Sequence, residues 1–450
     1  MKTISIGNGC GFWGDSLDAP VNLARHGNLD YLTLEYLAEL TMSILALQKQ
    51  RDPMLGYATD FISVLERLSP ILAEQPQLKI VTNAGGMNAA SCAQAALNVL
   101  KKQNITNRKI GIVLGDDLLP KLDELLQAGN SLAHLDSGKP LAEVRDRVVS
   151  ANAYLGAQPI AEAIAQGANI VITGRIADAS LTVGPCLHEF GWEWNDWRKL
   201  NAATVAGHLI ECGAQATGGL WMNADASTNL ANVGYPIAIV QADGTHRITK
   251  PSDSGGAVNI ETISEQLLYE VADPANYFTP DVVADFTNVQ LQQIERDVVE
   301  VRSGAGQPAT DTYKVSIAYR DGFTAAGTLL IPGPNAVAKA HASATIIRER
   351  LRIAGIVLEH FSVETLGAGD CVPGVMPRSE PPEVVLRIAV RDARKRNVQR
   401  FAKEFAPLAT SGYAGTTGYT TGRAQVREVF AYWPALISKS AVQSKVDVME

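Results

Sequence analysis

Short apolar runs rich in β-branched residues alternate with amphipathic segments in the first half of the chain. Four runs have the length of a strand and end in a turn residue: 3–8, 78–83, 109–115 and 169–174. Helical spacing of apolar positions is found at 37–48, 90–101, 118–128 and 157–166. This alternation is typical of βαβ units, so it predicts a parallel sheet covered by helices.

The pattern changes near residue 220. Sheet-like segments then dominate, at 235–240, 247–250, 312–320, 323–333 and 384–392, and helical segments are expected at 334–355 and 395–408. The predicted fold class is therefore α/β. We expect a Rossmann-like parallel-sheet N-terminal domain over residues 1–220, followed by an α+β C-terminal region over 221–450.

Composition and charge narrow the classes of partner. Hydrophobic residues make up 46% of the 450 residues, a share typical of a globular protein with a large interior. The net charge of -8 argues against nucleic acid and anionic membranes, which repel an acidic protein. A small-molecule ligand is expected, and an acidic one would need a local cluster of Arg, Lys or backbone N–H groups.

Cysteine and histidine usage indicates a reducing compartment. The five cysteines are widely spaced without a C-x-x-C pair, and the seven histidines lack metal-binding spacing, so we expect no disulfide framework and no zinc site. The start MKTISIGNGC lacks the apolar core and cleavage site of a secretory signal. We expect a cytoplasmic protein that forms a homo-oligomer.

The predicted strand ends are rich in Gly, Asn, Asp and Arg. Their sequences are GNGCGFWGD, TNAGGMN, LGDD and TGRIADAS. Ligands of parallel α/β sheets bind beyond the carboxyl ends of the strands, so a functional cleft is expected there.

Several sequence blocks together resemble the acyclic terpene utilisation (AtuA-like) family, formerly a domain family of unknown function. They occur in the family's order and include GNGCGFWGDSLDAP (7–20), DYLTLEYLAELTM (30–42), VTNAGGMN (81–88), ITGRIADASLTVGP (172–185), ECGAQATGG (211–219), SDSGGAVN (252–259), EQLLYEVADP (265–274) and GRAQVREVFAYWP (422–434). The resemblance implies a role in breaking down branched, isoprenoid-type acids or their CoA thioesters. It implies no catalytic residues.

A glycine motif follows the first predicted strand. Residues 9–14 match G-x-G-x-x-G, and Glu35 lies 21 positions beyond the motif, as in a dinucleotide-binding fingerprint. However, Asp18 and Pro20 place the helix start several residues late, and Asp15 would bring a negative charge to the phosphates. NAD is therefore the alternative. The favoured reading is a loop that presents Asn8, Gly11 and Asp15 to a substrate.

Two acids in LEYLAELTM are candidates for proton transfer. Glu35 and Glu39 are four residues apart, so they share one face if the segment is helical. An apolar setting would raise their pKa values and suit general acid–base chemistry. The alternative is that one is exposed while the other caps a backbone N–H.

The next two predicted strand ends offer hydrogen-bond donors. One group can present amides and glycines to an anion or a carbonyl, and consists of Asn83, Gly85, Gly86 and Asn88. The alternative is an ordinary βα turn with an Asn cap. Arg175 follows the strand at 169–174 and is suited to binding a carboxylate or phosphate. Asp178 either orients Arg175 and takes part in catalysis or caps the next helix.

Two glycine pairs lie further along the chain. Ser254, Gly255 and Gly256, like the pair at 218–219, either let backbone N–H groups approach an anion or form tight turns. Cys10 and Cys212 have no neighbouring His that would activate them as nucleophiles, so buried free thiols are expected.

These residues favour an enzyme of branched or isoprenoid carboxylic-acid or acyl-CoA catabolism. Carboxylates and amides at strand ends, without a nucleophile triad, indicate a lyase or hydratase that uses carboxylate acid–base chemistry. The alternatives are an NAD-dependent oxidoreductase and a non-catalytic acyl-CoA-binding subunit of a catabolic complex. The sequence assigns no cofactor and no metal.

Overall fold

The computed structural model describes residues 2–375, 377 and 379–450. The chain forms two compact units, one of Met1–Ala318 and Tyr432–Glu450 and the other of Tyr319–Ala431. The long strand β13 (Thr312–Pro332) contributes residues to both. We refer to them as the first and second unit.

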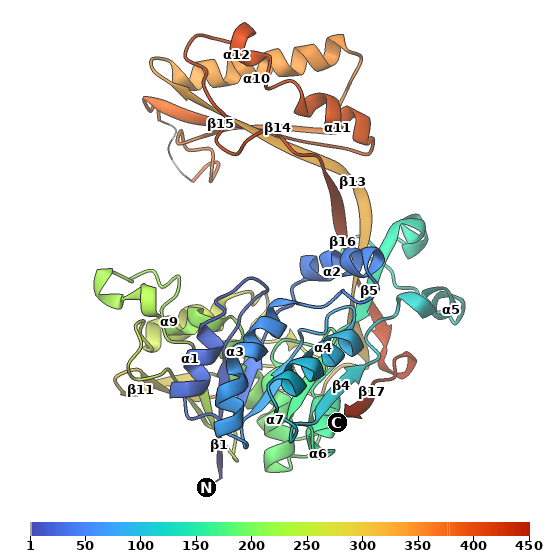
Figure 1. Cartoon of the computed structure of the whole chain (residues 1–450), viewed down its shortest axis with the longest axis vertical. Helices are drawn as coiled ribbons and strands as arrows, with labels where there is room; N and C mark the ends of the chain where they lie inside the picture. The colour runs from blue at the N-terminus through green and yellow to red at the C-terminus, as the bar shows by residue number, and fades with distance from the viewer. Residues whose placement is uncertain (1, 376, 378) are drawn as a thin grey trace. The chain divides into compact units, whose positions relative to one another are not determined.

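A ten-stranded mixed sheet forms the centre of the first unit (Figure 1). Its middle consists of five parallel strands in the order β1 (Thr3–Asn8), β2 (Tyr31–Leu34), β3 (Lys79–Thr82), β6 (Ile170–Thr173) and β4 (Ile110–Leu114). Antiparallel strands extend both edges: β7 (Ile237–Gln241), β8 (His246–Thr249), β12 (Val298–Arg302) and β11 (Gln290–Glu295) beyond β1, and β17 (Lys445–Met449) beyond β4. Outside this sheet, β5 (Val148–Ala153) pairs with β13, and β9 (Tyr277–Phe278) pairs with β10 (Val283–Ala284).

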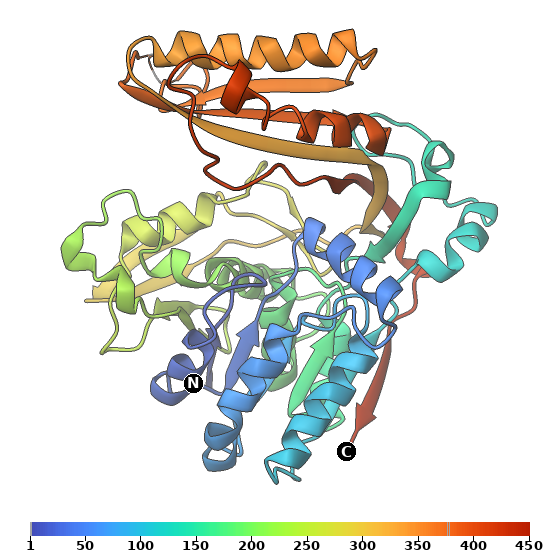
Figure 2. The same ribbon diagram turned by 45° about the horizontal axis from the view of Figure 1, so that its top comes forward.

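Helices cover both faces of the parallel strands. On one face α3 (Asp60–Glu74) contacts both α1 (Ala19–His26) and α4 (Ala89–Lys102), as Figure 2 also shows. On the other face α7 (Ser180–Phe190) lies between α6 (Gln158–Ala165) and α8 (Trp197–Glu211). Alternation along β4 explains the two faces, because Ile110 and Ile112 join the core under α1, α3 and α4 while Gly111 meets Ala163 of α6. Further helices of this unit are α2 (Glu39–Arg51), α5 (Leu122–Gln127) and α9 (Ile260–Leu268).

The order in which successive parallel strands are added across the sheet reverses between β3 and β6. The connections after β1, β2 and β3 run through α1, α3 and α4 on one face, whereas those after β4 and β6 run through α6, α7 and α8 on the other. At such a point the loops diverge to opposite faces and leave a crevice beyond the carboxyl ends of the strands.

The second unit has a β-α-β-β-α-β order. Its antiparallel sheet has the strand order β14 (His360–Leu366), β15 (Glu383–Asp392), β13 and β16 (Arg427–Ser438). This order is that of the ferredoxin-like split βαβ motif. Helices α10 (Ala336–Ile353) and α11 (Lys395–Ala402) bury an apolar core against the sheet, and the short α12 (Leu408–Ser411) follows α11.

The predicted α/β class is confirmed as a mixed α/β fold with one large mixed sheet. The narrower Rossmann-like assignment is not confirmed, because the parallel order β1-β2-β3-β6-β4 differs from the 3-2-1-4-5-6 order of dinucleotide-binding domains. The compact units also do not divide at residue 220, since β7 pairs with β1 and β8 pairs with β7 in the same sheet. Among the described helices, none has the length and apolarity that crossing a membrane requires.

The condition under which Glu35 and Glu39 would share a helix face is not met. Residues 31–34 form the parallel strand β2 and α2 begins only at Glu39, so Glu35 and Glu39 do not share a helix face. All four residues of β2 are buried, and a strand buried on both faces shows no alternation that would separate it from a helix.

Candidate functional site

Four neighbouring parallel strands each deliver a polar side chain to the same edge of the sheet. Glu35 follows β2, Asn83 follows β3, Arg175 follows β6, and Asp116 follows β4. All four residues are buried. The group lies at the point where the connections diverge, which is where the fold leaves room for a ligand.

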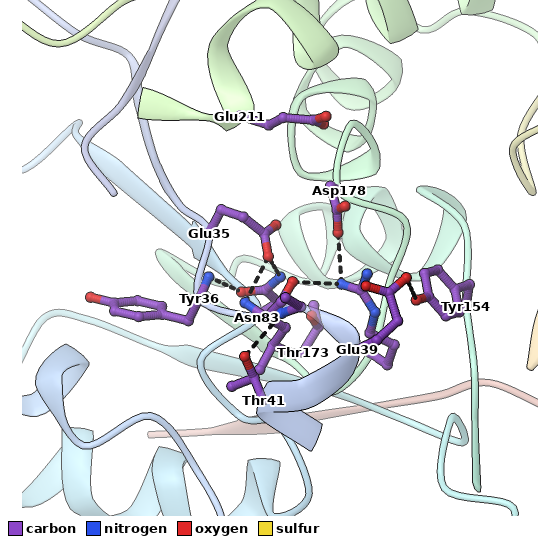
Figure 3. Close-up of polar contacts among 12 residues, drawn as sticks. Glu35, Tyr36, Glu39, Thr41, Asn83, Tyr154, Thr173, Asp178 and Glu211 are labelled. Atoms are coloured by element: carbon purple, nitrogen blue, oxygen red, sulfur yellow. Dashed lines mark hydrogen bonds and ion pairs between the residues drawn. The ribbon is translucent and has the colours of Figure 1, made fainter. Parts of the chain in front are cut away.

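Glu35 is a buried acid with one free oxygen. Its Oε1 accepts hydrogen bonds from the backbone N–H of Leu37, at 2.8 Å, and from Nδ2 of Asn83, while Oε2 has no hydrogen-bond partner. Asn83 is fixed in turn, because its Oδ1 accepts from the N–H of Tyr36 (Figure 3). Burial raises the pKa of Glu35 well above its ordinary value, nearby Asp178 raises it further, and Arg175 lowers it in part. Burial therefore favours the protonated form of Glu35.

Arg175 interacts electrostatically with Glu35 and forms an ion pair with the more exposed Asp178. Its Nη1 lies 2.6 Å from Oδ1 of Asp178 and 3.3 Å from the carbonyl of Leu37, and its guanidinium stacks on the Tyr154 ring at 4.1 Å. Asp116 holds the same loop, since its carboxylate accepts the Arg175 backbone N–H at 2.8 Å. The Arg175 side chain is 2% exposed, whereas that of Asp178 is 36% exposed. Asp178 is thus the accessible end of this pair.

The exposed side of Asp178 faces a cleft of about 680 Å³ within the first unit. Charged, aromatic and apolar side chains line it, among them Glu39, Leu135, Tyr154, Arg175, Asp178, Glu270, Tyr277, Phe278, Lys314 and Leu436. This volume and the mixture of an apolar wall with a few polar groups suit a small organic molecule.

Glu39 lines the cleft and is held there by two donors. The Tyr154 hydroxyl donates to its Oε1 at 2.9 Å, and Nζ of Lys314 lies 3.3 Å from the same atom (Figure 3 shows the tyrosine contact). Burial alone would raise the pKa of Glu39, but Lys314, Arg175 and the tyrosine outweigh it and lower the pKa. Glu39 is therefore an ionised residue of the cleft.

A second buried acid lies on the other side of Asp178 (Figure 3). Oε1 of Glu211 is 3.2 Å from Nδ1 of His208, and its Oε2 has no hydrogen-bond partner. Burial raises the pKa of Glu211 to about 7, although His208 opposes the shift. The cleft thus has Asp178 at its surface and two buried acids, Glu35 and Glu211, close enough to interact with it electrostatically.

The glycine loop after β1 closes on itself rather than opening to a ligand. Asp15 accepts the N–H of Gly11 at 2.8 Å and the hydroxyl of Tyr235 at 2.5 Å. A side chain at Gly11 would come within 2.8 Å of the Cys212 carbonyl carbon, so this glycine permits close packing. Asn8 donates to the carbonyl oxygens of residues 10, 210 and 211. These residues lie outside the cleft.

In the loop after β3, one asparagine belongs to the acid cluster and the other stabilises the loop and the start of α4. Asn83 contacts Glu35, whereas Asn88 accepts from the N–H of Ser91 as the cap of α4 and donates to the carbonyls of residues 53 and 55. Gly85 lets the loop approach β6, because a Cβ there would lie 2.5 Å from the Thr173 carbonyl oxygen. Gly86 has a positive φ of 50°, which few other residues adopt readily. The two glycines therefore shape the loop.

The hydrogen-bond donors of Ser254, Gly255 and Gly256 are bonded to backbone carbonyls of nearby loops. The N–H of Gly255 donates to the carbonyl of Asn232, the N–H of Gly256 to that of Thr228, and the Ser254 hydroxyl to that of Pro251. These donors do not point into the cleft.

Both cysteine candidates are protonated thiols. Burial raises the pKa of Cys10, whose Sγ donates to the Phe12 carbonyl, and burial likewise raises that of Cys212. A thiol is a poor nucleophile, so neither side chain suits covalent catalysis.

Sequence reasoning missed Tyr154, Lys314, His208, Glu211 and Asp116 as parts of one site. Asp116 had a usable signal, because it stands in the strand end LGDD. Tyr154 directly follows β5 and Lys314 lies in β13, two strands that pair across about 160 positions of sequence, and nothing local marks these residues.

Fold and cleft together define an α/β protein with a buried acid cluster beside a ligand-sized cleft at the carboxyl edge of parallel strands. The sequence profile of the acyclic terpene utilisation family protein AtuA matches residues 4–448, and the chain belongs to this family.

Other comparisons add little. No curated protein sequence matches the chain. Of the solved structures, a de novo designed protein, Ferredog-Diesel, is 13% identical with a TM-score of 0.15, covering 24% of this chain and 88% of its own. A homoserine dehydrogenase from Thiobacillus denitrificans is 10% identical with a TM-score of 0.16, covering 91% and 84%. Both scores are too low to support an argument about this chain.

Proposed function

We propose that this protein is a lyase or hydratase that acts on a branched, isoprenoid-type carboxylic acid or its acyl thioester in the cleft beside Asp178. The family description, acyclic terpene utilisation, supports the substrate class. The observation that supports the chemistry is the partly exposed Asp178, which interacts with two buried acids whose pKa values are raised.

The shape of the cleft matches such a substrate. Leu135, Phe278 and Leu436 offer an apolar wall for a branched hydrocarbon chain. Lys314, which is also a cleft residue, supplies a positive charge for a carboxylate or thioester carbonyl. A substrate with one apolar and one polar end would thus have a partner at each end.

Hydration of a conjugated double bond needs a base and an acid. The base removes a proton from water as its oxygen bonds to the β-carbon, and an acid gives a proton to the α-carbon; elimination is the reverse. In our proposal Asp178, which lines the cleft, takes a proton from water as the water oxygen bonds to the β-carbon, and the protonated Asp178 then gives a proton to the α-carbon. Glu211, whose pKa is raised to about 7, and Glu35, whose pKa is raised by burial, interact electrostatically with Asp178 from the protein interior.

An oxidoreductase is not favoured by this geometry. The glycine loop is closed by Asp15, α1 begins at Ala19 rather than within the glycines, and the strand order is not that of a dinucleotide-binding domain. A non-catalytic acyl-CoA-binding subunit and a homo-oligomeric state stay predictions.

The test is hydration of a branched α,β-unsaturated acyl thioester, followed by the loss of its conjugated ultraviolet absorbance. We expect turnover by the wild type and at least a hundredfold loss in Asp178→Asn, the usual size of a general acid–base contribution. Asp123→Asn is the matched control, because Asp123 also pairs with an arginine, Arg145 at 2.7 Å, but is not part of the cleft. Turnover that survives Asp178→Asn would refute the assignment, and ligand binding without turnover would favour the acyl-CoA-binding subunit.

A further inference from the structure

A second cavity, of about 590 Å³, lies within the second unit. One wall is the face of α11 and the residues after it, with Lys395, Gln399 and Lys403 spaced four residues apart, so that they stand in a row. The opposite wall is the segment 419–426, from which Tyr419, Arg423 and Gln425 line the cavity.

The lining is cationic. It contains three Lys or Arg side chains and no carboxylate. Within the described part of the chain, Lys403 and Arg423 have no ion-pair partner, and Lys395 contacts only the face of the Phe323 ring, at 5.7 Å. Three positive charges gathered without a counterion repel one another, and an anion between them would relieve that repulsion.

Charge is divided unevenly along the chain. Residues 319–431 contain 15 Lys and Arg against 10 Asp and Glu, a net charge of +5, although the whole chain carries -8. The remainder is therefore strongly acidic, and the second unit is the part of the molecule to which an anionic ligand would be drawn.

We propose that this cavity binds a phosphate-bearing nucleotide. Lys395, Lys403 and Arg423 would contact the phosphates, Arg423 with two parallel N–H groups. The amides of Gln399 and Gln425 provide further donors and acceptors, and the partly exposed Tyr419 ring, 37% exposed, offers a flat surface on which a base can stack. The volume falls within the range of small-molecule sites.

This inference does not depend on the acid–base chemistry of the first unit. The nucleotide end of a CoA thioester is one ligand of the required chemistry. Adenosine 3′,5′-bisphosphate presents that end alone, without the acyl group on which the proposed reaction acts.

The test is calorimetric titration of the full chain with adenosine 3′,5′-bisphosphate, inorganic phosphate and adenosine. We expect the bisphosphate to bind at least tenfold more tightly than either fragment, with an affinity that falls as salt is raised. Lys403→Gln combined with Arg423→Gln should weaken binding at least tenfold, and Tyr419→Ala about fivefold or more. Arg396→Gln is the matched control, because Arg396 belongs to α11 but does not line the cavity, and it should bind as the wild type does.

Asp178→Asn separates this proposal from the proposed function, because it should abolish turnover and leave bisphosphate binding unchanged. Three results would overturn the nucleotide site. They are no binding at millimolar bisphosphate, equal weakening by Arg396→Gln and the double variant, and inorganic phosphate that binds as tightly as the bisphosphate. Tighter binding of a single-stranded oligonucleotide, lost in the same double variant, would overturn it in favour of a nucleic-acid surface.

Discussion

Replacing Glu35 with Gln tests whether the buried carboxyl is neutral. Glutamine has the shape of a protonated glutamate, so its Oε1 can keep the hydrogen bonds from Leu37 and Asn83. Its amide group takes the place of Oε2, which has no partner in the wild type either. The substitution therefore removes the titratable carboxyl group at position 35 and keeps the hydrogen bonds to its Oε1.

The pH dependence follows from the raised pKa. A glutamate in the unfolded chain titrates near about 4.3, and burial holds the pKa of folded Glu35 well above that. The stabilising effect of the protonated group is complete at low pH and is lost as the pH rises toward the folded pKa. Relative to Glu35→Gln, the wild type should lose about 1.4 kcal/mol of unfolding free energy per pH unit, or about 2.7 kcal/mol between about pH 5.5 and 7.5, provided the folded pKa lies above this interval.

Urea unfolding followed by tryptophan fluorescence measures this difference. The six tryptophans are Trp13, Trp192, Trp194, Trp197, Trp221 and Trp433, so the signal reports the first unit alone. Glu39→Gln is the control. The pKa of Glu39 is lowered, so its stabilising effect is lost only at acid pH, and the difference from wild type should be flat over the same interval. A free-energy difference for Glu35→Gln that stays constant across this pH range would show that Glu35 is ionised and would refute the reasoning.

Three further predictions concern other residues and the NAD alternative. Arg175→Ala should lower the unfolding free energy by about 3 kcal/mol, and Arg175→Lys should lower it by less. The value is at the low end for breaking a buried ion pair because Asp178 is partly exposed. Equal denaturation midpoints for the wild type and the variants would contradict this prediction. Gly11→Ala should cost about 1–3 kcal/mol in calorimetric unfolding, whereas Gly418→Ala, with open space around it, should cost little. Calorimetric titration with NAD should show no low-micromolar binding, and such binding would revive the oxidoreductase alternative.

Several parts of the site were accessible to sequence reasoning. The strands at 79–82 and 170–173 were recognisable from apolar, β-branched runs, so Asn83 and Arg175 could be placed at strand ends. Parallel strands present their carboxyl ends at one edge, which is why the two residues were expected to converge. The structure brings both to Glu35.

Other residues could not be assigned from local pattern. Asn88 stands in the same glycine-rich loop as Asn83, and Asp15 and Ser254 stand in loops that are also rich in glycine. The polar side-chain atoms of these three residues are nevertheless bonded within the scaffold, to backbone groups and, for Asp15, to Tyr235 as well. A loop sequence shows which donors and acceptors are present. It does not show which of them the fold leaves free.

The sequence by itself determined the family, the alternation of strands and helices, and the side-chain chemistry at the strand ends, because these depend on local pattern. Only the tertiary structure decided that β6 inserts between β3 and β4, that Tyr154 and Lys314 reach the cleft, and that the pKa of Glu35 is raised. A pKa depends on lost hydration and on the distance to other charges, and a strand's neighbours depend on how the whole sheet packs. Both are long-range properties, fixed only when distant segments of the chain come together.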